Sequence, residues 1–224
     1  MPDTKLTWSN LREHLRRNAA VYLVLIVAAA VLTNLLWTTT TPRTPEANRV
    51  LIYLADIYSN TAPLKALEEE LLAREQAVDP TLEEVSFESL TFADPEENYT
   101  GPMVLMARLI AGEGDLFLAS ENAMEALIDS QACLPLDEYL ADGWMADTGL
   151  EPRYADIKDP ETGKTTRILA GLRVDSLTAL WDMQAFRNEG ACLCVAANST
   201  NLETSMQVAE AMVKALAKES KSHD

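Results

Sequence analysis

Histidine is nearly missing from this chain, and the lack narrows the chemistry that it can perform. The only two histidines, His14 and His223, lie near the two ends. The stretch between them therefore has no histidine for a catalytic triad, for general-base catalysis or for a typical zinc site. It also contains no P-loop and no nucleophile elbow. We therefore expect no enzymatic activity, no bound metal and no cofactor.

Basic residues are also scarce, except near the N-terminus. Four of the 18 Lys and Arg residues and two of the 35 Asp and Glu residues precede residue 19. Residues 38–224 therefore carry 14 basic and 33 acidic residues, a formal net charge of −19. Such a charge repels nucleic acids and anionic lipid headgroups, so neither is expected as a partner. Solubility alone is a sufficient reason for this charge.

Charge is absent altogether from residues 19–37, "AAVYLVLIVAAAVLTNLLW". As a helix this run would span roughly 28 Å, against about 30 Å for the hydrocarbon core of a membrane. It is longer than the apolar part of a signal peptide, and no A-x-A-like cleavage site or lipid-accepting cysteine follows it. Basic residues precede it, which places the N-terminus in the cytoplasm. We predict a single-pass anchor in the cell membrane, with the C-terminal domain outside the cytoplasm.

Cysteine is rare, and its number is odd. Cys133, Cys192 and Cys194 are the three cysteines of the chain. In "ACLCVAA", Cys192 and Cys194 alternate, so on a strand their side chains share one face. Because no further metal ligands accompany them, we expect buried apolar thiols rather than a zinc site. Their redox state stays open.

Two glycines interrupt the stretch "LIAGEGDLFLAS", residues 109–120. A phosphate-binding glycine loop follows a strand and begins a helix. Here the order is reversed, because Gly112 and Gly114 follow a helix and precede a strand, as left-handed helix caps commonly do. We therefore expect a joint between a helix and a strand, not a nucleotide site.

Strands and helices alternate along the rest of the chain. Such alternation indicates parallel pairing and an α/β, three-layer, doubly wound sheet. Ligands of such sheets lie beyond the carboxyl ends of the strands, here at residues 56–60 and 120–122. The simpler role for Ser120 is an N-cap of the helix that follows it. Strands are expected near 49–55, 83–92, 115–119 and 191–197, helices near 61–76, 101–112, 121–131 and 201–219, and a hairpin over 154–172.

Four stretches together resemble the extracellular solute-binding proteins of bacterial ABC importers, which have the type 2 periplasmic-binding-protein fold. They are "LIAGEGDLFLAS", "ACLPLDEYL", "GLRVDSLTALWDMQAF" and "ACLCVAANSTNLETSMQVAEAMV". The third is similar to the segment where the family's chain leaves its first lobe, although Arg173 stands where the family often has proline. The resemblance covers most of residues 49–216 in the family's order.

The chain departs from that family in one large respect. Only a short segment separates "DSLTALW" from the returning "CVAANS", where the family inserts a second lobe. The chain therefore resembles a solute-binding protein reduced to about one lobe. Closure of two lobes around a ligand needs both lobes, so the family's ordinary mechanism is not expected.

The resemblance implies a membrane-anchored, extracytoplasmic, solute-binding-protein-like domain associated with ABC-type transport. Its partners would be the membrane, a small solute such as a sugar, and an ABC permease or a second copy of the chain. The alternative is an interaction or structural module that has lost solute binding and acts through a protein partner or a homodimer. The expected domains are a cytoplasmic segment 1–18, the anchor 19–37, a tether 38–48, the solute-binding-like domain 49–218 and a polar tail 219–224. The implied ligand-binding residues are Asp56, Tyr58, Asn60, Ser120, Asp175 and Trp181.

Overall fold

The chain divides into two compact units in the computed structural model, Met1–Arg43 and Thr44–Asp224. The structure describes residues 8–40, 44–92, 100–158 and 162–220. Parts of the predicted cytoplasmic segment, tether and polar tail therefore lie outside the described residues.

The N-terminal unit consists of two helices, α1 (Trp8–Arg17) and α2 (Ala19–Thr40). Within α2, Ala19–Trp37 is long and apolar enough to cross a membrane, and none of it is buried inside the protein. A helix that is apolar on all sides and is not covered by protein suits a lipid environment. By length and composition, α2 is thus a candidate for either a signal anchor or a signal peptide.

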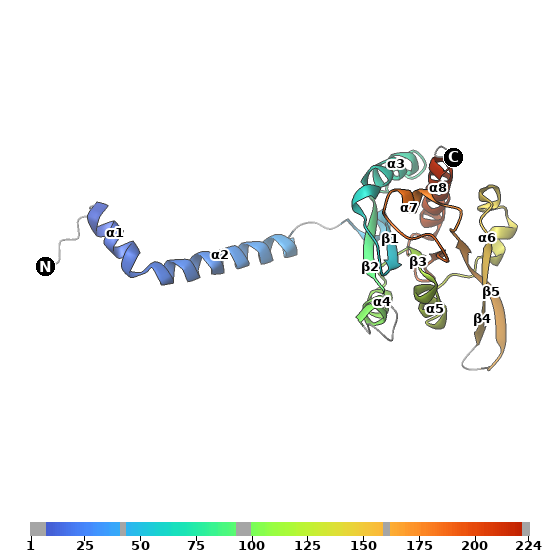
Figure 1. Ribbon diagram of the computed structural model, residues 1–224, viewed down its shortest axis with the longest axis horizontal. Helices are drawn as coiled ribbons and strands as arrows, with labels where there is room; N and C mark the ends of the chain where they lie inside the picture. The colour runs from blue at the N-terminus through green and yellow to red at the C-terminus, as the bar shows by residue number, and fades with distance from the viewer. Residues whose placement is uncertain (1–7, 41–43, 93–99, 159–161, 221–224) are drawn as a thin grey trace. The chain divides into compact units, whose positions relative to one another are not determined.

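The C-terminal unit is built on one six-stranded sheet with the order β2-β1-β3-β6-β5-β4 (Figure 1). The central strands are buried along nearly their whole length, as their continuous apolar sequences require. The edge strand β2 instead alternates between buried and more exposed side chains over its first half. The strands are β1 (Arg49–Asp56), β2 (Glu84–Thr91), β3 (Leu116–Ala119), β4 (Pro152–Lys158), β5 (Thr165–Arg173) and β6 (Cys192–Val195).

Helices cover both faces of this sheet, which confirms the predicted three-layer α/β architecture. One core contains side chains of α3 and α8, and the other contains side chains of α4 and α5. In Figure 1 these two pairs lie on opposite sides of the strands. The helices are α3 (Lys65–Glu75), α4 (Thr100–Ile110), α5 (Glu121–Asp129), α6 (Asp137–Ala141), α7 (Ala179–Asp182) and α8 (Leu202–Ser220), with 3-10 turns η1 (Glu46–Asn48), η2 (Ala62–Leu64) and η3 (Ala146–Thr148).

The sheet is mixed, so the expected parallel pairing holds for only part of it. β1 pairs in parallel with both β2 and β3. β6 is antiparallel to β3 and to β5, and β4 and β5 form the predicted antiparallel hairpin. The start of β6 therefore lies at the same edge as the carboxyl ends of β1 and β3. This reversal brings the segment before β6 to the sheet edge where a ligand is expected.

The glycines of "LIAGEGDLFLAS" have the predicted role. Gly112 and Gly114 have φ angles of +73° and +97°, between the end of α4 and the start of β3. Asp115 follows at once, and its backbone N–H donates to the carbonyl of Leu51 on β1 at 2.9 Å. The stretch thus connects α4 to β3, and its hydrogen bond to Leu51 aligns the start of β3 with β1.

Residues 150–190 build no second lobe among the residues that the structure describes. They form the hairpin, which belongs to the same sheet, and the short helix α7. Over the described residues, the C-terminal unit has one sheet, with a hydrophobic core on each face.

Candidate functional site

The candidate site lies at the carboxyl ends of β1 and β3. In the sheet, β1 lies between β2 and β3. After β1 the chain continues to β2 on one side, and after β3 it continues to β4 on the other side. A crevice opens between these two diverging segments. Ala55 and Ala119 are register partners there, so the residues that follow them, Asp56 and Ser120, are neighbours across the crevice. This is where polar side chains were expected to meet.

Asp56 ends β1 and is buried, with 3% of its surface exposed. Its Oδ1 accepts a hydrogen bond from the backbone N–H of Ile57 at 2.8 Å. Its Oδ2 has no hydrogen-bond partner among the described residues, and the Nε of Arg187 lies 3.5 Å away as an ion pair without hydrogen-bond geometry. A buried carboxylate oxygen that accepts no hydrogen bond is costly, and this oxygen is free to accept one from a ligand.

The first pocket, here called the polar pocket, has a volume of about 280 Å³. Three carboxylates and one guanidinium surround it, so its lining is acidic overall. Ser120 occupies the N-cap position of α5, but its hydroxyl makes no capping hydrogen bond, contrary to the simple cap role that its position suggested. The lining residues are Asp56, Ile57, Phe92, Ser120, Glu121, Asn122, Arg187 and Glu189.

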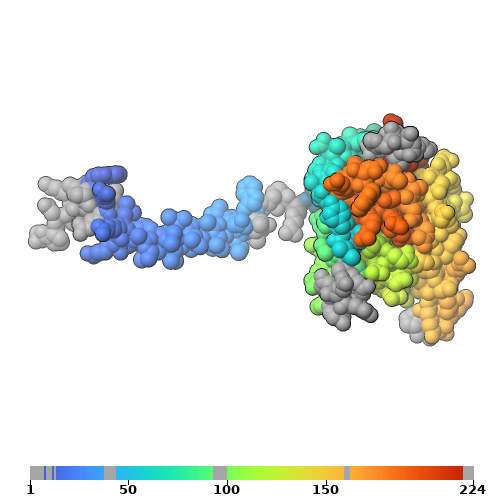
Figure 2. All heavy atoms as spheres, viewed as in Figure 1, coloured from blue at the N-terminus to red at the C-terminus, as the bar shows by residue number. Residues whose placement is uncertain are grey.

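The second pocket, here called the aromatic pocket, has a volume of about 330 Å³ and is lined by Tyr58, Trp181, Gln184 and Arg187. Tyr58 and Trp181 are 45% and 55% exposed, so neither is a core residue. In Figure 2 the orange surface around residue 180 lies against the cyan surface around residue 55.

Backbone contacts hold the two walls of the aromatic pocket together. Ser59 and Phe186 form an isolated antiparallel bridge. The backbone N–H of Asn60 donates to the carbonyl of Ala185 at 2.7 Å. The hydroxyl of Tyr58 donates to the carbonyl of Gln184 at 3.2 Å. The loop after β1 is thus fixed against the segment after α7.

Arg187 lines both pockets and joins them into one site. The sequence pattern did not indicate Arg187, Gln184 and Glu189 as site residues, because they follow no strand of the parallel part of the sheet. They reach the site because β6 runs antiparallel. The signal available in the sequence was their place directly before the last strand.

Two expected site residues, Asn60 and Asp175, do not line either pocket. The side-chain oxygen of Asn60 accepts a hydrogen bond from the N–H of Ala62 at 3.1 Å, as turn residues do. The carboxylate of Asp175 accepts from the N–H of Gly190 at 2.8 Å. Its carbonyl accepts from the side-chain amide of Asn188 at 2.6 Å. Asp175 thus shapes the segment that carries Arg187 and Glu189.

A larger pocket of about 510 Å³ lies elsewhere, between α6 and α8. Trp144, in its wall, donates from Nε1 to the carbonyl of Met206 at 3.1 Å. That hydrogen bond gives the tryptophan a packing role. This pocket is mainly apolar and is not at the strand ends, so we place the candidate site in the smaller pair.

Among the described parts of the chain, no group of three His, Cys, Asp or Glu side chains is placed to hold a metal ion. The carboxylates of the polar pocket are hydrogen-bond acceptors, and the aromatic pocket beside it has two exposed aromatic faces. In shape and chemistry this lining suits a small molecule that has several donors and one flat apolar side.

Comparison with known proteins gives limited similarity. The chain matches no protein-family model and no curated protein. Among solved structures it is similar to the periplasmic binding protein AttC of Agrobacterium tumefaciens strain C58, in an open unliganded conformation. The sequence identity is 12%, the TM-score is 0.40, and the match covers 78% of this chain and 83% of that chain.

Proposed function

We propose that the chain is a membrane-anchored, extracytoplasmic, solute-binding-protein-like domain that holds a small solute and presents it to an ABC-type permease. The observation that supports this most directly is the joined pair of pockets at the strand switch point. Arg187 lines both pockets, and Asp56, whose Oδ2 accepts no hydrogen bond from the described residues, lies in the wall of one.

The lining suits a sugar or a similar polyol. Asp56, Ser120 and Asn122 offer oxygen acceptors and an amide for hydroxyl groups. Tyr58 and Trp181 offer exposed aromatic faces for the apolar side of a sugar ring. Such a division, with a few polar groups beside an apolar wall, is usual for small-molecule sites. The proposal involves no catalysis and no cofactor.

The N-terminal unit supports a location at the membrane. In the proposal α2 is an uncleaved anchor, and the basic residues before it keep the N-terminus in the cytoplasm. The C-terminal unit would then meet solutes outside the cytoplasm.

A thermal-shift screen of the full-length chain in detergent micelles, with neutral mono- and disaccharides, tests the binding proposal. At least one sugar should raise the melting temperature. Trp181→Ala should weaken that binding about tenfold, which corresponds to about 1.4 kcal/mol of lost stacking. The matched control is Tyr154→Ala, because Tyr154 is an exposed aromatic on β4 that lines neither pocket. Equal loss in both variants, or no response to any sugar, would contradict the proposal.

The alternative, a module that acts through a homodimer, has its own support. Met103, Met106 and Ile110 lie on α4 at helical spacing, and all three are exposed. An exposed apolar stripe of this kind marks an interface. If the alternative holds, Met103→Glu together with Met106→Glu should abolish chemical cross-linking between copies, while the sugar screen stays negative in every variant.

A further inference from the structure

Two of the three cysteines face each other in the core between the sheet and α5. The Sγ–H of Cys194, on β6, donates to the Sγ of Cys133 at 2.9 Å. Cys133 lies in the connection that follows α5, 61 positions earlier in the chain. Both side chains are buried.

The backbone holds this pair in place. Cys133 forms an isolated antiparallel bridge with Ala196. On either side of it, the N–H of Leu134 donates to the carbonyl of Val195 at 2.8 Å, and the N–H of Ala197 donates to the carbonyl of Ala132 at 2.8 Å. The loop therefore runs along the end of β6 as a short extra strand. Because both backbones are fixed, the contact between the two sulfurs does not depend on a flexible segment.

Cys192 provides an internal comparison. It lies on the same face of β6 and is also buried, as its alternation with Cys194 predicted. No sulfur contact of Cys192 is found among the described residues, whereas Cys133 and Cys194 make one. Burial, the largest cause, raises the pKa of Cys192 to about 11, so this thiol is protonated and unreactive.

We propose that Cys133 and Cys194 form a disulfide bond that ties the connection after α5 to β6, while Cys192 remains a free thiol. The sulfurs need to approach by only about 0.9 Å to reach the bond length of about 2.05 Å. An outward-facing domain would meet the oxidising conditions in which such bonds persist.

The oxidant is a protein disulfide of a thiol–disulfide exchange catalyst. One thiolate of the pair attacks a sulfur of that disulfide, forms a mixed disulfide and releases one catalyst thiolate. The second thiolate attacks the protein sulfur of the mixed disulfide and releases the other catalyst thiolate. The two protons lost by Cys133 and Cys194 go to the two released thiolates, and the catalyst gains the two electrons.

The exchange takes place before the core closes. In the folded chain, the hydrogen bond with Cys133 and burial hold the pKa of Cys194 well above its usual range. Few thiolates exist under those conditions, so an open or partly folded chain reacts much faster. Once formed, the bond is shielded from reductants for the same reason.

Thiol counting on the full-length chain, extracted from its membrane, tests the proposal. The chain is denatured in excess iodoacetamide, with and without prior reduction, and its mass is measured. One alkylated thiol without reduction and three after reduction are expected, with the peptides of Cys133 and Cys194 linked in the unreduced digest. Three alkylated thiols without reduction, or any linkage that involves Cys192, would overturn the proposal.

Serine variants provide a second measurement. Cys133→Ser, Cys194→Ser and the double variant should each lower the melting temperature by roughly 10 °C, since all three lose the same cross-link. Cys192→Ser is the matched control, which should keep the linkage and lower the alkylation count without reduction to zero. If the double variant loses far more stability than either single variant, the cysteines act as independent packing residues and the proposal fails.

Discussion

A single carboxylate, that of Asp115, connects three parts of the C-terminal unit. Its Oδ2 accepts a hydrogen bond from the N–H of Leu51 on β1 at 2.9 Å, and its Oδ1 accepts one from the hydroxyl of Ser199 at 2.7 Å. Asp115 directly precedes β3, and Ser199 lies in the connection after β6. Burial raises the pKa of Asp115, because removal from water disfavours the charged form. The two hydrogen bonds offset part of that cost.

We expect Asp115→Ala to lower the free energy of unfolding by about 2 kcal/mol, because it leaves the buried N–H of Leu51 without its partner. Ser199→Ala removes only the hydroxyl bond and should cost about 1 kcal/mol. Urea denaturation of the detergent-solubilised full chain, followed by tryptophan fluorescence, measures both. Equal losses in the free energy of unfolding for the two variants would show that the hydrogen bond to Leu51 adds no measurable stability.

At the site, residues that directly follow a parallel strand could be predicted from the sequence. Asp56 and Tyr58 come at the end of β1 and Ser120 follows β3, and all three line the pockets. Trp181, on α7, was instead expected from the family resemblance. Sequence pattern alone cannot show which polar groups lack partners. Arg187 was not predictable, because it enters the site through a strand that pairs antiparallel. Strand direction depends on long-range pairing, which a local pattern does not contain.

At the scale of elements, the joint between α4 and β3 depends on two glycines for different reasons. Both have positive φ angles, which cost other residues roughly 1–2 kcal/mol. A Cβ on Gly112 would meet nothing within 4 Å. A Cβ on Gly114 would lie 2.7 Å from Cδ2 and 2.8 Å from Cε2 of Tyr53. Tyr53 is buried and stacks on Phe117, so its ring cannot easily move.

Gly112→Ala should therefore cost about 1 kcal/mol, and Gly114→Ala about 2–4 kcal/mol, since the second adds overpacking to the backbone strain. The pair of variants separates the two effects within one joint. Chemical denaturation of the full chain gives both values. A Gly114→Ala variant no less stable than Gly112→Ala would mean that the Tyr53 ring moves freely.

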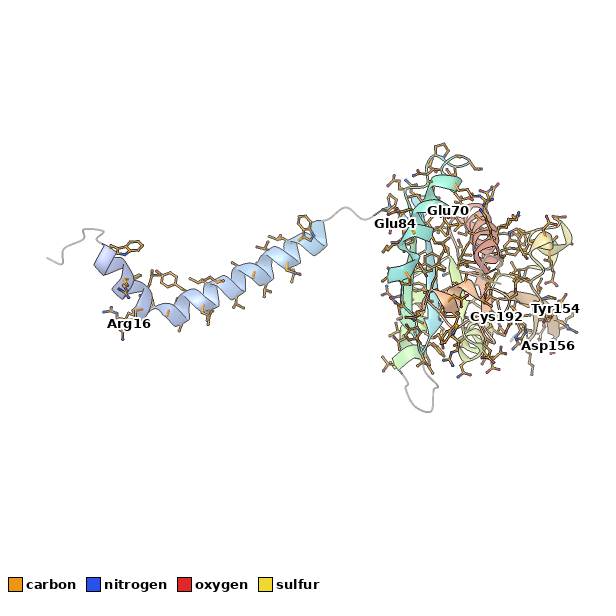
Figure 3. The ribbon with its side chains drawn as sticks, turned by 45° about the horizontal axis from the view of Figure 1, so that its top comes forward. Arg16, Glu70, Glu84, Tyr154, Asp156 and Cys192 are labelled. Carbon is orange, nitrogen blue, oxygen red and sulfur yellow. The ribbon has the colours of Figure 1, made fainter. Side chains whose placement is uncertain are left out.

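The elements themselves were largely predictable, and their pairing less so. Continuous apolar runs predicted β1, β3 and β6 within a residue or two, and the hairpin expected over 154–172 is formed by β4 and β5. The alternation of strands and helices predicted the parallel pairing of β1 with β2 and β3, but not the antiparallel pairing of β6. Figure 3 labels Tyr154 and Asp156, which lie on the edge strand β4. The sequence pattern did not specify where the hairpin of β4 and β5 lies in the sheet.

At the scale of the whole molecule, the first question is whether α2 remains attached. In an uncleaved anchor, the N-terminus stays in the cytoplasm and everything after α2 is outside. Protease added to intact cells should therefore remove residues 38 onward and spare an epitope tag placed at the N-terminus. Permeabilised cells, in which the tag should also be lost, are the control. Recovery of a mature chain that begins after Thr41 would identify residues 19–37 as a signal peptide instead.

The second question is how tightly one copy can hold a solute. A pocket with useful affinity generally buries 70–90% of its ligand, whereas Tyr58 and Trp181 form an open wall that is about half exposed. A single copy should therefore bind more weakly than the micromolar range, about −8 kcal/mol, because one side of the solute stays in water. A second copy or a permease that covers the residues between Asp56 and Asn60 and those near Trp181 would complete the enclosure.

Calorimetry tests this with the sugar found by thermal shift, by comparing the affinity of nanodiscs that hold one copy with that of nanodiscs that hold two. We expect tighter binding only with two copies, or after addition of the permease. Submicromolar binding by a single copy, abolished by Trp181→Ala and kept by Tyr154→Ala, would show that one lobe is sufficient.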